Sequence, residues 1–387
     1  MSHLNTIFHQ LQQFIPGHQF EKLISKYSGD RYAKAFTCKN QLSVMLYAQA
    51  TGKDSLRDIQ TGLFVNQSKL YHLGIRSIAK STISHANKRI DYRIYEELFY
   101  NFLERCKDIT PTRKFKFKNP LYALDSTVVD LCLKLFPWAK FRTAKGAIKI
   151  HPLLNLRTQI PEVIVITDGK QSDVKVAKST EWNLSSDSIL VVDRAYIDWK
   201  WLSGLGSEGV NFVTRSKKNM QYGVIGQHKT APSGQCIKDE KILLKNLTSL
   251  SNYSKPLRRI EWLNKKTGEV LVFITNNFEF SARTIAGIYK SRWDIELFFK
   301  WLKQHLKIKT FLGTSENAVK TQIWIAMIYY LLLKYIKYQT KYGYSLLEFT
   351  RIIGEALFFR QNLIDLLSMD YKNFKRIRDP DPQLALF

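Results

Sequence analysis

The chain has few of the residues that build disulfide frameworks or cysteine-based metal sites. Its four cysteines, Cys38, Cys106, Cys132 and Cys236, are widely separated in a sequence of 387 residues, and no Cys-x-x-Cys motif or Cys/His pairing occurs. This spacing supports neither a cysteine-based zinc site nor a disulfide framework. The expected environment is therefore a reducing one.

Long apolar segments are also missing. The longest apolar run covers residues 323–333, and a run of this length is too short to cross a bilayer. Residues 1–7 lack the positive start and apolar stretch of a signal peptide. We expect no membrane association and a cytoplasmic, nucleoid-associated protein. The apolar run itself predicts a buried helix over residues 315–339.

Acidic residues are scarce relative to basic ones. The chain has 33 Asp and Glu against 59 Lys and Arg, a formal net charge of +26, and its basic residues are interleaved with Tyr, Phe and Trp. An apolar content of 45% is enough for a packed core. The charge predicts a polyanionic partner, with nucleic acid favoured over a membrane surface.

The chain reads as three regions. Residues 1–110 have mostly helical periodicity, and the small polar and basic residues of 77–89 suit the reading helix of a helix-turn-helix DNA-binding domain, or else a solvated helix of a bundle. A basic, proline-bounded connector then leads to a predicted domain over 120–345. Residues 346–387 are expected to form a helical C-terminal region with a frayed end.

Between the connector and residue 214, strand and helix patterns alternate. We expect strands at 121–133, 147–156, 161–167, 189–193 and 210–214, and helices at 172–179 and 199–205. This order predicts an α/β core with a mixed sheet. Residues 217–280 interrupt the alternation with three further strand patterns, 236–244, 258–263 and 269–275, and we interpret them as a β-rich insertion.

An ordered set of polar residues follows the insertion. In the run 288–303, Tyr289, Arg292, Glu296 and Lys303 are offset by 0, 3, 7 and 14 positions. On one continuous helix, at ~100° per residue, these offsets fall within about 60° of one another. The run then predicts a helix face suited to holding a metal ion and gripping phosphates.

An ordinary amphipathic helix with a solvated polar face is the alternative. Phe298 and Leu302 would form its buried side. Asp294 is another acid in the run, but it lies roughly 200° from Glu296 around the helix. Glu296 is therefore the acid expected on the same face as Tyr289 and Arg292.

Two strand-associated carboxylates are candidates to join Glu296. Asp125 lies within the first strand pattern and Asp193 ends the apolar strand 189–193. Acids at such positions cost desolvation energy unless a cation or hydrogen bonds meet them, and α/β sheets bind ligands at strand ends. Asp130 and Asp198 are each five residues further on, so Asp130 is expected on the other sheet face and Asp198 beyond the strand end.

Three convergent carboxylates suit a pair of Mg²⁺ ions about 4 Å apart, because hard cations prefer oxygen ligands and such a pair catalyses in-line phosphoryl transfer. Asp125, Asp193 and Glu296 are thus the predicted catalytic residues and metal ligands. On a strongly basic chain they indicate phosphodiester chemistry on DNA.

These residues carry a family resemblance. Asp125-Ser-Thr, Asp193-Arg-Ala-Tyr and the spacing Tyr-x2-Arg-x3-Glu-x6-Lys resemble the DDE transposases of the bacterial insertion-sequence-four family. Four residue types fixed over fifteen positions make the last motif specific. Ala195 stands where that family often has glycine. The resemblance extends over residues 120–340.

The resemblance implies an RNase H-like catalytic core that uses Mg²⁺, with Mn²⁺ as a substitute. It implies cleavage at transposon terminal repeats and 3′-hydroxyl attack on target DNA by a homodimer, with hairpin ends in some members. Tyr289, Arg292, Lys303 and the neighbouring Lys300 would hold end DNA. Trp262 would stack a flipped base, although strand packing is its favoured interpretation.

Three other functions are compatible with these features. A transposase-derived DNA-binding protein without catalysis would bind end DNA and never nick it. A general nuclease would cut without needing a terminal sequence. A peripheral membrane protein would use its charge on lipid instead of DNA.

Overall fold

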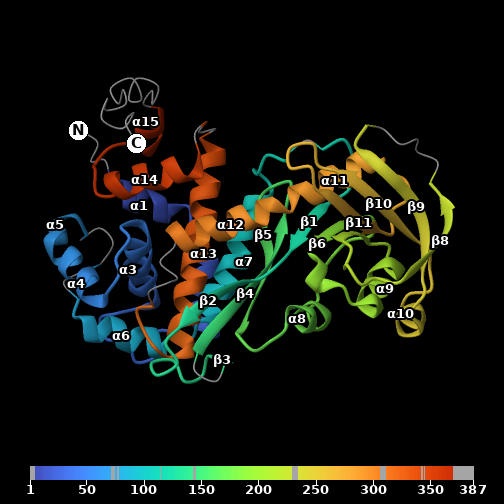
Figure 1. Cartoon of the computed structure of the whole chain (residues 1–387). Coiled ribbons are helices and arrows are strands. Elements are labelled where there is room, and N and C mark those ends of the chain that lie inside the picture. Colours follow the sequence, from blue (N-terminus) through green and yellow to red (C-terminus); the bar gives the residue numbers. More distant parts are fainter. Residues whose placement is uncertain are drawn as a thin grey trace, which may run out of the picture. The chain divides into compact units, whose positions relative to one another are not determined.

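The computed structural model describes residues 5–70, 75, 78–113, 115–142, 145–228, 234–305, 311–340, 343 and 345–368. The chain divides into two compact units. One unit comprises Met1–Thr110 and His305–Phe387, and the other comprises Pro111–Gln304. Figure 1 shows the helices and strands of each unit.

The first unit consists of helices. In chain order these are α1 (Ile7–Gln13), α2 (Gly17–Lys26), α3 (Cys38–Ala50), α4 (Leu56–Val65), α5 (Gln67–Leu70), α6 (Lys80–Arg89), α7 (Arg93–Lys107), α13 (Glu316–Gln339), α14 (Leu346–Ala356) and α15 (Leu363–Ser368). Thr or Ser side chains cap α1, α3, α4, α13 and α14 by accepting a hydrogen bond from a backbone amide of the first turn. Such caps satisfy amides that have no partner within the helix.

Helix α13 lies at the centre of this unit, packed against α7, α3, α6 and α14 (Figure 1). Almost all of its residues from Ala318 to Ile336 are buried, which confirms the buried helix predicted over 315–339. Within the described residues, no helix combines the length and apolar character required to cross a membrane. Because α13 groups with the N-terminal helices, the units of the structure do not follow the expected division into 120–345 and 346–387.

The second unit is built on one mixed sheet of eleven strands. The order is β2-β4-β1-β6-β7-β11-β10-β9-β8, with β3 and β5 also paired to β4. The strands are β1 (Leu121–Leu124), β2 (Thr127–Leu131), β3 (Lys140–Arg142), β4 (Lys145–Asn155), β5 (Ile160–Asp168), β6 (Ile189–Val192), β7 (Asn211–Arg215), β8 (Tyr222–Gln227), β9 (Cys236–Leu244), β10 (Leu257–Leu263) and β11 (Val270–Thr275). The pairs β1–β6 and β6–β7 are parallel. The α/β class with a mixed sheet is confirmed.

The helices of this unit pack on both faces of the sheet. They are α8 (Asp173–Ser179), the short 3₁₀ helix η2 (Arg194–Tyr196), α9 (Trp199–Ser207), α10 (Leu247–Asn252), α11 (Ala282–Ser291) and α12 (Trp293–His305). Ile274 of β11 packs in one core with Leu202 of α9, whereas the ring of its neighbour Phe273 lies 5.0 Å from the ring of Tyr289 on α11. Since successive strand residues face opposite sides, α9 and α11 lie on opposite faces, as Figure 1 shows.

The strand expected at 121–133 is interrupted in its middle. β1 and β2 pair with β4 in one continuous register, Leu124 opposite Leu153 and Thr127 opposite Ile150. That register would place Pro152, which has no amide hydrogen, opposite Asp125. The prediction that Asp125 sits within a strand is therefore corrected: Asp125 follows the end of β1.

The β-rich insertion belongs to the central sheet. Its three predicted strands are confirmed as β9, β10 and β11, and β11 pairs antiparallel with β7. The insertion therefore widens the sheet beyond β7. The sequence did not predict β8, because Gly223 and Gly226 interrupt its strand-forming Tyr, Val and Ile residues and glycine is depleted in strands.

The insertion contains a buried ion pair that predicts a stability effect. The fully buried Arg258 donates from Nε and Nη2 to the Asp239 carboxylate, at 2.8 and 2.6 Å. We expect Arg258→Met to lower the free energy of unfolding by roughly 3–5 kcal/mol, because it leaves a buried carboxylate without its guanidinium. Urea unfolding followed by circular dichroism measures this.

Two further variants test the explanation. Arg258→Met combined with Asp239→Leu should recover most of the loss, since no charge is then stranded. Glu269→Gln, which breaks the more exposed pair with Arg215, should cost at most about 1 kcal/mol. Equal losses from Arg258→Met and Glu269→Gln would contradict the account.

Candidate active site

Asp125 and Asp193 occupy neighbouring strand ends. β1 and β6 run parallel, and their last residues, Leu124 and Val192, pair with each other. Each aspartate is the first residue after its strand. Adjacent strands lie about 4.8 Å apart. Asp193 also caps η2, where its Oδ1 accepts a hydrogen bond from the amide of Ala195 at 2.7 Å. The parallel pairing thus places two carboxylates side by side at the carboxyl edge of the sheet.

The helix predicted across residues 288–303 is broken at Arg292. Helix α11 ends at Ser291 and α12 begins at Trp293. The assumption of one straight helix face is therefore wrong: Tyr289 lies on α11, Arg292 lies at the junction, and Glu296 and Lys303 lie on α12. The amide of Arg292 donates to the Tyr289 carbonyl, a three-residue step that tightens the chain at this point.

Arg292 nevertheless connects the acids. Its Nη1 donates to Oδ2 of Asp125 at 3.0 Å, and its Nη2 donates to the carboxylate of Glu296. The guanidinium also lies 5.8 Å from the centre of the Tyr289 ring. One cation therefore joins an acid at the sheet edge to an acid one turn into α12.

The site carries more negative than positive charge. Burial raises the pKa of Asp125 to about 6; the Ser126 amide and Arg292 oppose this rise, and the charges of Asp193 and Glu296 add to it. The guanidinium of Arg292 pairs with two of these three carboxylates, Asp125 and Glu296. An additional cation near Asp125 would be electrostatically favoured.

The donor set suits a hard divalent cation, since all three side chains offer carboxylate oxygens. Within the described residues, however, no three His, Cys, Asp or Glu side chains are drawn together as a metal-binding group. Arg292 lies between Asp125 and Glu296 instead. The three carboxylates are suitable ligands for such an ion. In this structure the Arg292 guanidinium occupies part of the space between them.

The other acids considered from the sequence lie outside this group. Asp294 forms an ion pair with Arg113. Asp198 pairs with Lys178 at 2.9 Å and caps α9. Asp130 is exposed on β2. None of these three acids joins the hydrogen-bonded group around Arg292.

A second acid near Asp125 was missed by the sequence reasoning. The Ser126 amide donates to Oδ1 of Asp125 at 2.8 Å, and the Ser126 hydroxyl donates to Oδ1 of Asp173 at 2.8 Å. Lys149 also donates to Asp173, at 3.1 Å. Asp173 begins α8, 47 residues after Ser126, so no local pattern could have revealed this contact.

Two further buried groups border this network. Burial lowers the pKa of His151 to about 4, so its ring is neutral at neutral pH; its Nδ1 lies 3.8 Å from Asp173. The hydroxyl of Tyr196 is buried close to Ser126. Burial, followed by the charges of Asp125, Asp173 and Asp193, raises the pKa of Tyr196.

The remaining predicted DNA contacts lie on two elements of this unit. Lys300 and Lys303 follow Glu296 on α12 at offsets of four and seven, which keeps them near its face. Trp262 is half-buried near the end of β10. Ile260, two residues earlier, pairs with Phe273, so strand alternation places Trp262 on the sheet face that α11 covers.

The predicted DNA-reading helix corresponds to α6, whose exposed side is polar and basic and whose buried residues are Ile83, Ala86 and Asn87. The turn that would precede this helix in a helix-turn-helix lies largely outside the described residues. The helix-turn-helix assignment stays a prediction.

Comparison with known proteins identifies similar sequences. Residues 116–332 match the family described as "Transposase DDE domain", which implies an RNase H-like core, and residues 3–76 match a domain family of unknown function. A relative from Sinorhizobium fredii named as a transposase is 31% identical over 246 residues, covering 63% of this chain and 68% of the relative. A relative from Geobacillus stearothermophilus, named as a transposase for an insertion sequence element, is 29% identical over 283 residues, covering 72% and 74%.

The network behind Asp125 generates a prediction. Asp173→Ala removes the acceptor of both Ser126 and the largely buried Lys149. We expect it to lower the free energy of unfolding by about 1–3 kcal/mol, because the partly buried Ser126 hydroxyl loses its acceptor and Lys149 is left with the Gln171 carbonyl. Urea unfolding measures the change.

The exposed pair of Glu104 and Lys107 on α7 provides the control. Glu104→Ala should change the free energy of unfolding by no more than about 0.5 kcal/mol. An Asp173→Ala protein as stable as Glu104→Ala would show that the network does not hold the Asp125 region.

Proposed function

The chain belongs to the transposase DDE domain family, and from this premise we propose that it cuts DNA at the terminal repeats of an insertion sequence and joins the freed ends to target DNA. The observation that carries the proposal is the pairing of Asp125 and Asp193 at adjacent strand ends, with Glu296 tied to Asp125 through Arg292.

The proposed chemistry is phosphodiester hydrolysis followed by transesterification. Water first cuts the end and leaves a 3′-hydroxyl. The oxygen of this hydroxyl then bonds to a target phosphorus and loses its proton, while the bond from that phosphorus to a target 3′-oxygen breaks and the departing oxygen gains a proton. The number of phosphodiester bonds is unchanged in this second step, so no external energy source is needed. Hairpin ends are a variant of the first stage in this scheme.

Asp125, Asp193 and Glu296 are the residues proposed to hold divalent metal, Mg²⁺ in first place and Mn²⁺ as a substitute. When bound, such ions polarise the phosphate and lower the pKa of an attacking water or hydroxyl. Proteins with DDE domains generally use divalent ions. Ser126 holds Asp125 through its amide, and Ala195 holds Asp193 in the same way.

Tyr289, Arg292, Lys300 and Lys303 are proposed to bind end DNA. A phosphate placed at the acids would lie within reach of the Arg292 guanidinium, which forms bidentate contacts with phosphate as readily as with carboxylate. Lys300 is exposed on α12 and suited to a backbone phosphate. Trp262 is proposed, on its position alone, as the platform for an unstacked base.

The second candidate function is that of a DNA-binding protein that binds the same transposon ends and does not cut them. The presence of all three acids favours the enzyme. The proposal also includes a homodimer that holds two transposon ends, because both ends must be cut and joined to one target.

A Glu296→Gln variant tests the enzyme proposal. The substituted amide keeps the size of the side chain and an oxygen for Arg292 while removing the charge. We expect nicking of end DNA in Mg²⁺ to be lost and binding of end DNA to be largely kept, measured on a labelled duplex by gel electrophoresis. Full nicking by the variant would refute the role of Glu296.

Asp294→Asn is the matched control, two residues away on α12. Asp294 pairs with Arg113 instead of Arg292, so nicking should persist in this variant if the protein remains folded. Binding of end DNA by the wild type without nicking, in either Mg²⁺ or Mn²⁺, would favour the silent DNA-binding protein.

A further inference from the structure

A groove of about 660 Å³ begins four residues after Asp193. Its walls come from the connection into α9 (197–200), from residues between 217 and 221 after β7, and from residues 244–252 at the end of β9 and in α10, with Lys178 of α8 at its rim. Along the chain, the groove therefore lies close to the end of β6, the strand that Asp193 follows.

The charge of the groove is positive. Lys178, Lys200 and Lys217 line it and are all exposed, whereas Asp198 is the one acid among its lining residues. Lys178 pairs with Asp198 at 2.9 Å, and the Lys217 ammonium donates to the Ile197 carbonyl at 3.4 Å. Lys200 makes no ion pair with a described residue. Lysines therefore remain available to an anionic ligand.

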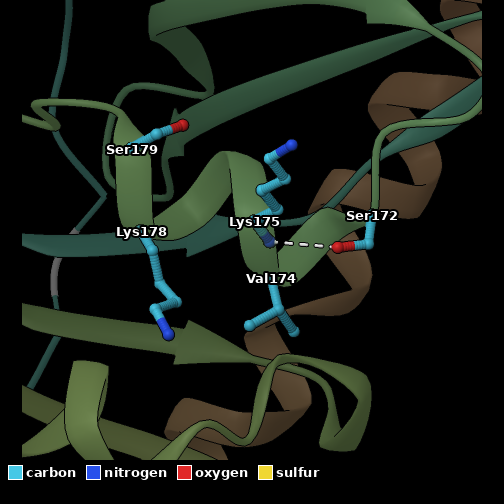
Figure 2. A pocket seen from close by; sticks show the side chains of 5 residues that line it. All are labelled: Ser172, Val174, Lys175, Lys178 and Ser179. Carbon is cyan, nitrogen blue, oxygen red and sulfur yellow. Dashed lines mark hydrogen bonds between the residues drawn. The ribbon is translucent and has the colours of Figure 1, made fainter.

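A second hollow, of about 410 Å³, continues this surface along α8. It is lined by Ser172, Val174, Lys175, Lys178 and Ser179, and it shares Lys178 with the groove. Figure 2 shows Lys178 leaving α8 on the same side as Val174, with Lys175 extending on the other side. The two hollows therefore meet at Lys178, and the second adds Lys175 on the other side of α8.

The walls offer further contacts of the kind that nucleic acid backbones use. Asn219, Asn246 and Asn252 supply amide groups. The half-buried ring of Trp199 is held edge-on against Tyr253, with the ring centres 6.0 Å apart. Lysine and amide donors on a rigid concave surface match the phosphate oxygens of DNA, which carry most contacts that lack sequence preference.

The groove lies on a different face of the sheet from the proposed end-DNA contacts. Its helices, α9 and α10, lie on the face opposite α11 (Figure 1). Strand transfer requires two DNA segments at the same acids, so one segment must approach from a side that the other leaves free.

We propose that this groove binds the sugar–phosphate backbone of target DNA. The assignment rests on the proposed transposase function. It gives the lysines of α8 and α9 and the segment after β7 a role separate from that of α12: they hold the DNA that is attacked, and α12 holds the DNA that attacks.

The test uses the full chain with Lys200→Ala and Lys217→Ala combined. The control removes the same charge from the turn between the antiparallel strands β10 and β11, the hairpin turn, by combining Lys265→Ala and Lys266→Ala, both exposed and outside the groove. Each protein is assayed for nicking of end DNA, for transfer of pre-cleaved ends into a plasmid, and for the salt dependence of binding to an unrelated duplex. Thermal unfolding confirms that each variant is folded.

The groove variant should nick normally and lose plasmid transfer about tenfold or more, and its salt slope on the unrelated duplex should fall by about two. Replacing both lysines with Arg should restore both properties. Unchanged transfer, an unchanged salt slope, or equal losses in the hairpin-turn control would overturn the proposal.

A loss of end binding and nicking in the groove variant alone would assign the groove to end DNA and would also overturn it. If the wild type cuts no DNA at all, the proposed function fails, whereas the salt slope on the unrelated duplex still decides whether the groove binds DNA.

Discussion

The parallel pairing of β1 with β6 is the constraint on which the site depends. It aligns Leu124 with Val192, so that the residues that follow, Asp125 and Asp193, leave neighbouring strands at the same edge. Two carboxylates at such an edge repel each other unless a cation intervenes. Arg292, at the break between α11 and α12, brings that positive charge and links Asp125 to Glu296. The guanidinium of Arg292 therefore lies between an acid at the sheet edge and an acid on α12.

Much of the fold was readable from sequence because its signals are local. The apolar runs of β6 and α13 and the strands β9, β10 and β11 follow directly from composition and periodicity. The interruptions were not readable in the same way. A run from 288 to 303 without proline or a break signal looks like one helix, so the sequence gives no sign of the interruption at Arg292 between α11 and α12. The role of Asp173 could not be predicted from the sequence either, because its hydrogen bond with Ser126 joins residues 47 positions apart.

The basic residues of the second unit lie on both faces of its sheet. The face under α11 leads to Tyr289, Arg292 and the lysines of α12, whereas the face under α9 and α10 opens into a lysine-lined groove. The acids lie at the edge between these faces. A net charge of +26 predicts a polyanion without saying where it binds; the two faces suggest that two DNA segments approach one reaction centre from different sides.

The central claim is that Asp125, Asp193 and Glu296 hold the same divalent cation site. Replacing Mg²⁺ with Fe²⁺ and adding ascorbate and peroxide generates radicals that cut the protein chain close to the bound ion. The account predicts fragments that end near residues 125, 193 and 296 together, all suppressed by excess Mg²⁺ and lost in an Asp125→Asn variant. Cleavage that is absent from these three segments, or that persists unchanged in Asp125→Asn, would contradict it.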